Sequence, residues 1–270
     1  MIIKHMTILN DILTRKKEEV QGDRKSMPRK ELEKLALAMP PNINFLKAIN
    51  ERKTEIPNLI AEIKHRSPSK GILCQNFNHI KLAQTYVKND VSAISVLTDQ
   101  YFFGGSLAHL KSIYELQTGL PLLRKDFIYD EYQLYQAKVA GASAALLIVA
   151  MLDEATLANL INVASEINLD VVVEIHNTKE LEIALKTETK IIGINNRNLH
   201  TFKTSLNTTK QLRPLIPNNI CVIAESGIHN NTDVKTLAQL NINAMLIGEG
   251  IVTAKDIGSK IQYFINAHEQ

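Results

Sequence analysis

The 270-residue sequence predicts an α/β fold, a (β/α)8 barrel preceded by an N-terminal helical extension. Short, nearly continuous apolar runs alternate with helical patterns, as expected of parallel strands that helices cover. Eight such units follow one another at a spacing of mostly about 20 to 30 residues, which favours a closed TIM barrel. An open, doubly wound sheet stays possible, because sequence rhythm does not show closure.

The expected strands share an apolar run of four to six residues, and they are Leu59–Lys64, Ala93–Leu97, Leu120–Arg124, Ala144–Val149, Asp170–Ile175, Ile191–Asn195, Ile220–Ala224 and Ala244–Ile247. The helical patterns between them are Ile80–Val87, Leu107–Leu116, Glu131–Ala140, Glu154–Ile167, Thr178–Leu185, Thr204–Leu215, Thr232–Leu240 and Ala254–Ala267. Because no linker rich in Gly, Ser or Pro follows residue 57, we expect one domain over residues 1–270. Its extension covers residues 1–58 and its barrel residues 59–270.

The extension carries apolar residues at helical spacing over residues 6 to 20, which predicts a helix that ends near Gly22. A second short helix is expected from Pro28 to Leu37. The basic residues of this region are interrupted by Glu18, Glu19 and Asp23. We therefore expect a solvated helix face rather than a nucleic-acid surface, at the positions Arg15-Lys16-Lys17, Arg24-Lys25 and Arg29-Lys30.

The bulk properties indicate a soluble cytoplasmic protein. The net charge is +3, no segment approaches the length of a membrane span, and no signal peptide is recognisable. Cys74 and Cys221 lie far apart and form no C-x-x-C pattern, as expected in a reducing compartment. We expect no nucleic-acid or membrane partner.

Ionisable residues occur at the carboxyl ends of the predicted strands, where barrels of this kind carry their active sites. Glu62 and Lys64 lie two residues apart and point to the same face of a strand. Taken alone, they favour a structural ion pair at a strand end over an active site. The whole set favours a site for an anionic substrate and for proton transfer, with the members Lys64, Lys125, Arg197, Glu62, Glu174 and Glu225.

Two glycine-containing turns follow the last two strands, Glu225-Ser226-Gly227 and Gly248-Glu249-Gly250. A phosphate site in a barrel commonly lies here, because glycine permits close backbone approach and the next helix presents free N–H groups. Ordinary turns that need a positive φ are the alternative. We expect the side chain of Glu249 to point away from a phosphate while its N–H contributes.

Other chemistries are not supported by a motif. No G-x-G-x-x-G follows the first strand, so a dinucleotide site is not expected. His65, His176 and His229 lie near strand ends without metal-ligand spacing, and His176 is interpreted as a loop residue. No nucleophile elbow is present, so Ser67 and Ser69 are expected to hydrogen-bond the substrate. We predict no metal and no cofactor. The aromatic loop at residues 99–106 is either a lid over an aromatic substrate or a surface loop.

Taken together, these segments resemble the indole-3-glycerol phosphate synthase family over residues 8 to about 264. The resemblance lies in Ile60-Ala61-Glu62-Ile63-Lys64 with Ser67-Pro68-Ser69-Lys70-Gly71, Ser95-Val96-Leu97-Thr98-Asp99, Leu123-Arg124-Lys125-Asp126-Phe127-Ile128, Leu146-Leu147-Ile148-Val149, Val173-Glu174-Ile175-His176, Gly193-Ile194-Asn195-Asn196-Arg197-Asn198-Leu199 and Ala224-Glu225-Ser226-Gly227-Ile228.

The resemblance implies ring closure of 1-(2-carboxyphenylamino)-1-deoxyribulose 5-phosphate, with loss of CO2 and water, to indole-3-glycerol phosphate in tryptophan biosynthesis. It makes Lys125 the candidate general acid. Lys64 either holds the substrate carboxylate or acts as a second acid, and Glu174 and Glu62 are candidate bases or hydroxyl-orienting groups. The other implied site residues are Asn195, Arg197, Glu225 and Ser226 for orientation, Ser67, Gly227, Gly248 and Glu249 around the phosphate, and Phe103, Leu146 and Leu199 around the aromatic ring.

The resemblance further implies a small phosphorylated aromatic substrate, no cofactor and a monomer, with weak association with other tryptophan-pathway enzymes left open. The main departures are Tyr101, where the family has a lysine, and Glu249, where Ser or Thr is common. A different phosphate-binding isomerase of the barrel class and a non-catalytic binding barrel are the competing hypotheses. The first lacks the Glu62-x-Lys64 signature, and the second predicts loss of Lys125 or Glu174.

Overall fold

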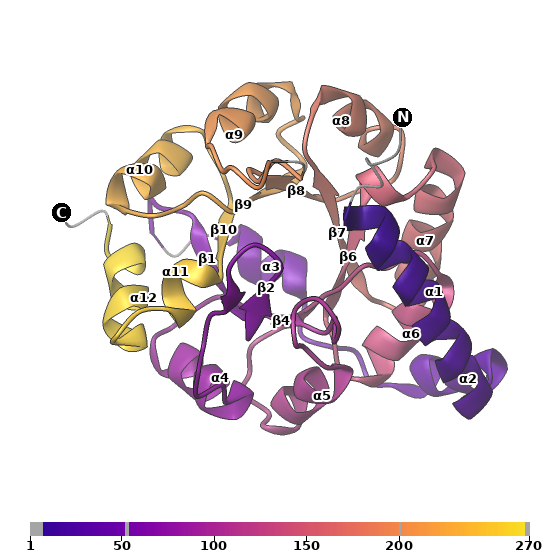
Figure 1. Cartoon of the computed structure of the whole chain (residues 1–270). Coiled ribbons are helices and arrows are strands. Elements are labelled where there is room, and N and C mark those ends of the chain that lie inside the picture. Colours follow the sequence, from indigo (N-terminus) through magenta and orange to yellow (C-terminus); the bar gives the residue numbers. More distant parts are fainter. Residues whose placement is uncertain (1–7, 52–53, 200, 268–270) are drawn as a thin grey trace, which may run out of the picture.

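A closed barrel of eight parallel strands forms the centre of the molecule (Figure 1). The computed structural model describes residues 8–51, 54–199 and 201–267, so the expectations for residues 1–7 lie outside the described part. Each strand pairs with its neighbours in chain order, and β1 closes the barrel by pairing with both β4 and β10. The barrel strands are β1 (Asn58–Ile63), β4 (Ala93–Leu97), β5 (Leu122–Lys125), β6 (Ala144–Ile148), β7 (Asp170–Ile175), β8 (Ile191–Asn195), β9 (Cys221–Glu225) and β10 (Ala244–Ile247). The prediction of a barrel rather than an open sheet is confirmed.

Helices surround the barrel as an outer ring, at the places where the sequence predicts them (Figure 1). They are α4 (His79–Lys88), α5 (Leu107–Glu115), α6 (Glu131–Val139), α7 (Glu154–Glu166), α8 (Thr178–Ala184), α9 (Asn207–Leu212), α10 (Asn231–Gln239) and α12 (Ile257–Ile265). The helix expected from Thr204 begins three residues later, at Asn207, and is followed directly by the 3-10 turn η2 (Arg213–Leu215). Another 3-10 turn, η1 (Val149–Met151), follows β6. The sequence did not predict the short helix α11 (Glu249–Val252) or the small hairpin of β2 (Arg66–Ser67) and β3 (Gly71–Ile72).

In the described residues, three helices precede the barrel, namely α1 (Ile8–Ser26), α2 (Arg29–Ala38) and α3 (Phe45–Asn50), and the last was not predicted. The expected end of the first helix near Gly22 is wrong, because α1 continues through Gly22 to Ser26. A glycine inside a helix costs about 1 kcal/mol relative to alanine. Contacts across to α6 hold this part of α1 in place, since Arg24 pairs with Asp130 at 2.6 Å.

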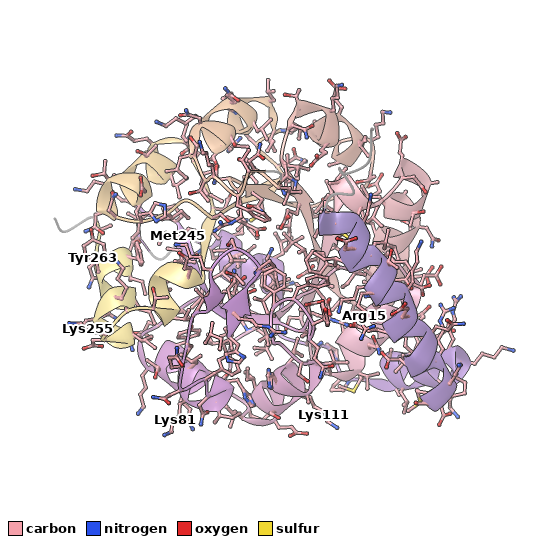
Figure 2. All side chains as sticks on the ribbon, in the orientation of Figure 1. Arg15, Lys81, Lys111, Met245, Lys255 and Tyr263 are labelled. Carbon is pink, nitrogen blue, oxygen red and sulfur yellow. The ribbon has the colours of Figure 1, made fainter. Side chains whose placement is uncertain are left out.

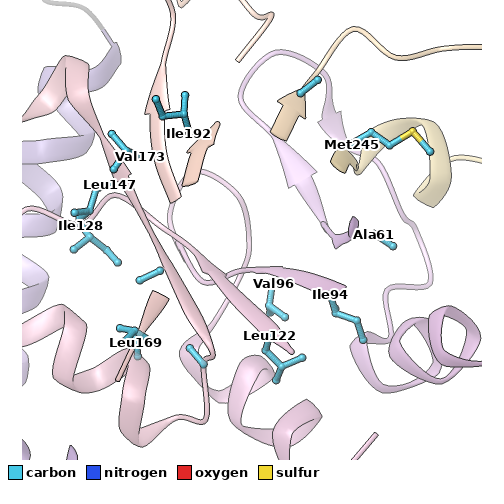
Figure 3. Packing of buried hydrophobic residues seen from close by; sticks show 14 of the residues in the cluster. Ala61, Ile94, Val96, Leu122, Ile128, Leu147, Leu169, Val173, Ile192 and Met245 are labelled. Atoms are coloured by element: carbon cyan, nitrogen blue, oxygen red, sulfur yellow. The ribbon is translucent and has the colours of Figure 1, made fainter. Parts of the chain in front are cut away.

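The side chains of the barrel strands alternate between two apolar clusters. The inner cluster fills the barrel with residues such as Ile60, Leu123 and Val172, and Phe45 and Ile49 of α3 pack against it from the amino ends of the strands. The outer cluster lies between the strands and the surrounding helices, and Figure 3 shows part of it, including Ala61, Ile94, Val96, Leu122, Leu147, Val173 and Ile192. Because this period of two continues to the carboxyl ends, it decides which polar side chains face the barrel interior.

The surface carries most of the charge, as shown by the outward-pointing Lys81, Lys111 and Lys255 (Figure 2). Lys16 is one of the buried charged residues, and its expected place on a solvated face is wrong. Its side chain is only 4% exposed, and its Nζ lies 3.0 Å from Oδ2 of Asp99 and 3.0 Å from Oδ1 of Asp126. Asp99 and Asp126 follow β4 and β5, so this ion-pair cluster fastens α1 to the barrel. None of the helices in the described ranges combines the length and apolar character of a membrane span.

Candidate active site

The register of the strands brings the central polar residues together. Glu62, Lys125 and Glu174 each lie two residues after an inward-facing apolar residue, at Ile60, Leu123 and Val172. Glu225 follows Ile223 in the same way on β9, and Asn195 lies four residues after the inward-facing Ile191 on β8. Asn195 and Glu225 are paired across these two strands. Inward alternation therefore carries all of these side chains into the upper layer of the barrel, above a closed apolar interior.

One cavity at the carboxyl ends of the strands is lined by every residue that the sequence analysis assigns to the site. These residues are Glu62, Lys64, Ser67, Phe103, Lys125, Leu146, Glu174, Asn195, Arg197, Leu199, Glu225, Ser226, Gly227, Gly248 and Glu249. Two apolar residues of α1, Leu9 and Ile12, line the same cavity and were not predicted. Nothing in the sequence marks them, because their place depends on how α1 docks across the barrel end.

Lys125 lies at the centre of the cavity floor. Its Nζ lies 2.8 Å from Oε2 of Glu174 and 2.8 Å from Oε2 of Glu225. Burial by itself would lower the pKa of Lys125, but the charges of Glu174, Glu225 and Glu62 outweigh it and hold that pKa well above its usual range. Lys125 is therefore a protonated cation at neutral pH, although its side chain is only 12% exposed.

The two carboxylates beside Lys125 differ in their protonation. Burial raises the pKa of Glu225, and the nearby charge of Glu174 adds to this, so that the pKa of Glu225 reaches about 7 despite Lys125. Burial acts in the same direction on Glu174, but Lys125 and His176 outweigh it and hold the pKa of Glu174 well below its usual range. The amide of Asn195 also donates a hydrogen bond to Oε1 of Glu174 at 3.1 Å. Glu174 is thus ionised at neutral pH, whereas Glu225 can take up and release a proton.

Glu62 and Lys64 face the same cavity, as expected from their spacing, and Ile63 between them joins the outer apolar cluster. Lys64 Nζ lies 3.4 Å from Oε1 of Glu62 and 5.4 Å from the centre of the Phe103 ring. Gly248 faces the same carboxylate, because a Cβ added there would clash with Oε1 of Glu62. The pair therefore lines the cavity and does not act only as a structural ion pair at a strand end.

The expected phosphate rim contains both glycine-rich turns. Ser226 and Gly227 adopt positive φ values of 63° and 74°, so the first turn has the left-handed conformation that glycine accommodates without strain. The carboxylate of Glu249 pairs with Lys70 and lies 3.9 Å from Nη2 of Arg197. Glu249 thus lies between two cations from different loops.

The aromatic loop after β4 lies partly over the cavity and partly at the surface. The backbone N–H groups of Phe102 and Phe103 donate hydrogen bonds to Oδ1 of Asp99 at 2.7 Å and 3.1 Å. Phe103 lines the cavity beside Phe127, with their ring centres 5.9 Å apart. Tyr101, in contrast, is 59% exposed and lies under the guanidinium of Arg15. One part of the loop therefore borders the cavity and another lies at the surface, and a lid over an aromatic substrate stays a prediction.

The three histidines near strand ends have different surroundings. His229 lines the cavity from an exposed turn, and His65 stacks on Phe77. His176 contacts the catalytic candidate Glu174 directly, so its interpretation as a plain loop residue missed this contact. In the part of the chain that the structure describes, no group of three or more His, Cys, Asp or Glu side chains is arranged to hold a metal ion.

Comparisons with solved structures support the barrel architecture. A 3-hexulose-6-phosphate synthase from Salmonella typhimurium superposes with a TM-score of 0.64 and 15% identity, over 78% of this chain and 97% of that one. A mutant tryptophan synthase alpha-subunit from Pyrococcus furiosus gives a TM-score of 0.58 at 15% identity, over 77% of this chain and 98% of the other. At such identities these structures show the fold alone.

Sequence comparisons are more specific. The family model of indole-3-glycerol phosphate synthase matches residues 9–264. The indole-3-glycerol phosphate synthase of Roseiflexus sp. (strain RS-1) is 46% identical over 263 residues, which cover 95% of this chain and 97% of the relative. That of Dehalococcoides mccartyi (strain CBDB1) is 43% identical over 258 residues, 94% of this chain and 98% of the relative. The chain belongs to the indole-3-glycerol phosphate synthase family, the carboxy-lyases of tryptophan biosynthesis.

Proposed function

We propose that Lys125 is the general acid with which this chain closes the indole ring of 1-(2-carboxyphenylamino)-1-deoxyribulose 5-phosphate. The observation that carries the proposal is the place of its ammonium, 2.8 Å from each of two carboxylates on the cavity floor. A cation held this firmly is positioned to protonate a substrate oxygen without a search through rotamers.

In the first step, the ring carbon that bears the carboxylate attacks the ketone carbon of the sugar chain, and electrons from the anilino nitrogen drive the attack. The ketone oxygen develops negative charge and takes a proton from Lys125. An alkoxide is a far stronger base than an amine, so the transfer proceeds even though carboxylates favour the ammonium form. Loss of CO2 then restores the aromatic ring.

In the second step, the new hydroxyl leaves as water and a proton leaves the methylene carbon beside the nitrogen, so that the double bond of the five-membered ring forms. This step requires an acid at the oxygen and a base at that C–H, while the ring N–H is kept in the product. The two carboxylates beside Lys125 fit these different needs. Glu174 is ionised and can accept a proton, whereas Glu225, with a pKa of about 7, can be protonated. Glu62 is an alternative base, and Lys64 is an alternative acid at 3.4 Å from it.

The remaining cavity residues bind and orient the substrate in this proposal. Asn195 and Ser226 orient the sugar hydroxyls, and Lys64 holds the substrate carboxylate where it does not act as an acid. Arg197 is the cation of the phosphate rim, and the phosphate lies against the backbone of the neighbouring turns, which comprise Ser67, Gly227, Gly248 and Glu249. The aromatic ring of the substrate lies among Phe103, Leu146 and Leu199, which line the apolar part of the cavity.

The proposal includes a monomer in a reducing compartment such as the cytoplasm. Every residue given a role comes from one chain, so the site does not require a second copy. Neither Cys74 nor Cys221 forms a disulfide in the described part of the chain, which suits a reducing environment.

The test uses the purified protein with the carboxyphenylamino substrate, without added metal or nucleotide, and follows the fluorescence of the indole product. Wild-type protein should form product, and Lys125→Ala should lose about 10²- to 10⁴-fold in kcat. The exposed Lys111→Ala is the matched control and should keep wild-type activity. A loss below tenfold for Lys125→Ala would move the acid role to Lys64, which Lys64→Ala then tests in the same assay.

A further inference from the structure

His176 lies behind the active-site carboxylate Glu174, directly after the end of β7. Its Nε2 lies 3.3 Å from Oε1 of Glu174, and its Nδ1 lies 3.0 Å from Oε2 of Glu180 on α8. Only 10% of its side chain is exposed. The imidazole therefore bridges two carboxylates that come from a strand end and from the first turn of the next helix.

Glu180 is itself firmly fixed. Its Oε2 also accepts a hydrogen bond from the backbone N–H of His176 at 2.8 Å, and its Oε1 accepts one from the side chain of Asn177 at 2.6 Å. Asn177 is in turn the N-cap of α8 and accepts a hydrogen bond from the backbone N–H of Glu180. This closed set of hydrogen bonds fixes the position of the imidazole from the side away from the cavity.

The two oxygens of Glu174 have different partners. Oε2 accepts a hydrogen bond from Lys125, whereas Oε1 accepts one from Asn195 and faces His176. Among the described residues, Glu225, on the other side of Lys125, forms an ion pair with Lys125 alone. The charged groups around His176 are therefore Glu174 on β7 and Glu180 on α8, which it contacts directly. Lys125 on β5 and Glu225 on β9 lie farther away, on the other side of Glu174. Of the two carboxylates that share Lys125, only Glu174 therefore has a second positively charged neighbour.

We propose that His176 is a positioning residue for this reaction, an imidazolium that orients Glu174 and keeps it ionised as the proton acceptor. The proposal rests on the function proposed above. Burial by itself would lower the pKa of His176, but its contacts with Glu174 and Glu180 outweigh it and raise that pKa to about 10. The imidazole is charged across the working range, and it acts through Glu174 because it does not line the cavity.

The kinetic test compares the pH profiles of kcat and KM for wild type, His176→Asn and His176→Gln. An opposite charge at this distance shifts a carboxylate pKa by about 1 to 3, so its loss should move the acid limb of kcat up by about one pH unit or more. At the pH of the wild-type acid limb, kcat should then fall about tenfold, with little change in KM. Glu180→Gln should shift the limb in the same direction, whereas Glu182→Gln, an exposed carboxylate on the same helix, should not.

A superimposable pH profile for the His176 variants would overturn the proposal, even if their melting temperatures fall, because a merely structural residue leaves the profile in place. A second readout needs neither activity nor a variant that folds well. In protein with 15N-labelled histidine, the nitrogen shifts of His176 should stay those of an imidazolium up to about pH 9. Neutral-imidazole shifts at pH 8 would refute the inference, whereas an inactive protein with a charged His176 would count only against the proposed function.

Discussion

Replacing Lys16 by methionine should loosen the attachment of the N-terminal extension to the barrel. The ammonium of Lys16 lies 3.0 Å from both Asp99 and Asp126, which are themselves almost completely buried. Methionine fills a similar volume and keeps the helix propensity of α1. The substitution therefore removes the charge with little change in packing and leaves two buried carboxylates with less compensation.

The size of the effect follows from that loss. Removing one partner of a buried ion pair typically costs about 3 to 5 kcal/mol, because the remaining charge is stranded. Arg124 and Thr98 still contact Asp126, at 3.0 Å and 2.5 Å, so the lower end of about 3 kcal/mol is expected. For a chain of this size, about 2 °C of melting temperature corresponds to each kcal/mol, which predicts a fall of about 6 °C.

The pH dependence provides an internal check on this cluster. Burial acts to raise the pKa of Asp126, but Arg124, Lys16 and Thr98 outweigh it and lower that pKa to about 2, from 3.8. A lowered carboxyl pKa stabilises the folded state above pH 4, and this contribution is lost as the pH falls toward 2. It amounts to about 2.5 kcal/mol, at about 1.4 kcal/mol for each unit of pKa. In Lys16→Met, part of this acid-labile stability should already be missing at pH 7.

The assay is thermal unfolding followed by circular dichroism at pH 7 and at pH 4, together with KM for the substrate. Lys17→Met is the matched control, since Lys17 is the next residue on α1 and is exposed. KM should rise in Lys16→Met only, because α1 brings Leu9 and Ile12 to the cavity. Equal melting temperatures for the two variants at pH 7 would refute the argument that the cluster holds the extension.

Two further predictions concern the cavity wall. Glu249→Ser removes a negative charge from the expected phosphate rim. KM for the phosphorylated substrate should therefore fall by about two- to fivefold at low salt, and by less at high salt. An unchanged KM at low salt would contradict the placement of the phosphate. Gly193→Ala places a Cβ against Oε1 of Glu225, so kcat should fall by about tenfold to a hundredfold. Gly22→Ala, where the added Cβ meets nothing within 4 Å, should leave kcat unchanged and serves as its control.

The barrel could be predicted from the sequence because each strand is a local signal. An apolar run such as that of β9 (Cys221–Glu225) is buried throughout, and its period of two extends to the polar residue Glu225 at its end. The same regularity placed Glu174 and Glu225 correctly on one side of the sheet. Closure itself was only favoured by the number of units, since the pairing of β1 with β10 joins segments nearly two hundred residues apart.

The features that were missed depend on contacts between distant parts of the chain. Lys16 lies among Arg15, Lys17 and Glu18 in a pattern typical of a solvated helix, and only the ends of β4 and β5 make its position buried. His176 pairs with Glu180 four residues later, which is a local contact. Its proposed role depends on its contact with Glu174, whose carboxylate faces the cavity. The short helix α3 is recognisable only by the apolar interior that Phe45 and Ile49 cover.

The cavity floor also carries a feature that stability alone does not explain. Among the residues that the structure describes, Oε1 of Glu225 has no hydrogen-bond partner, although the carboxylate is buried against Gly193. A buried polar atom left unpaired costs about 1 to 3 kcal/mol. Asn195 lies on the neighbouring strand opposite Glu225, but its amide donates to Glu174 instead. An ionised oxygen that is buried without a donor favours the protonated carboxyl, in the same direction as the burial that raises the pKa of Glu225, so the floor keeps one carboxyl that can give up a proton beside one that is ionised.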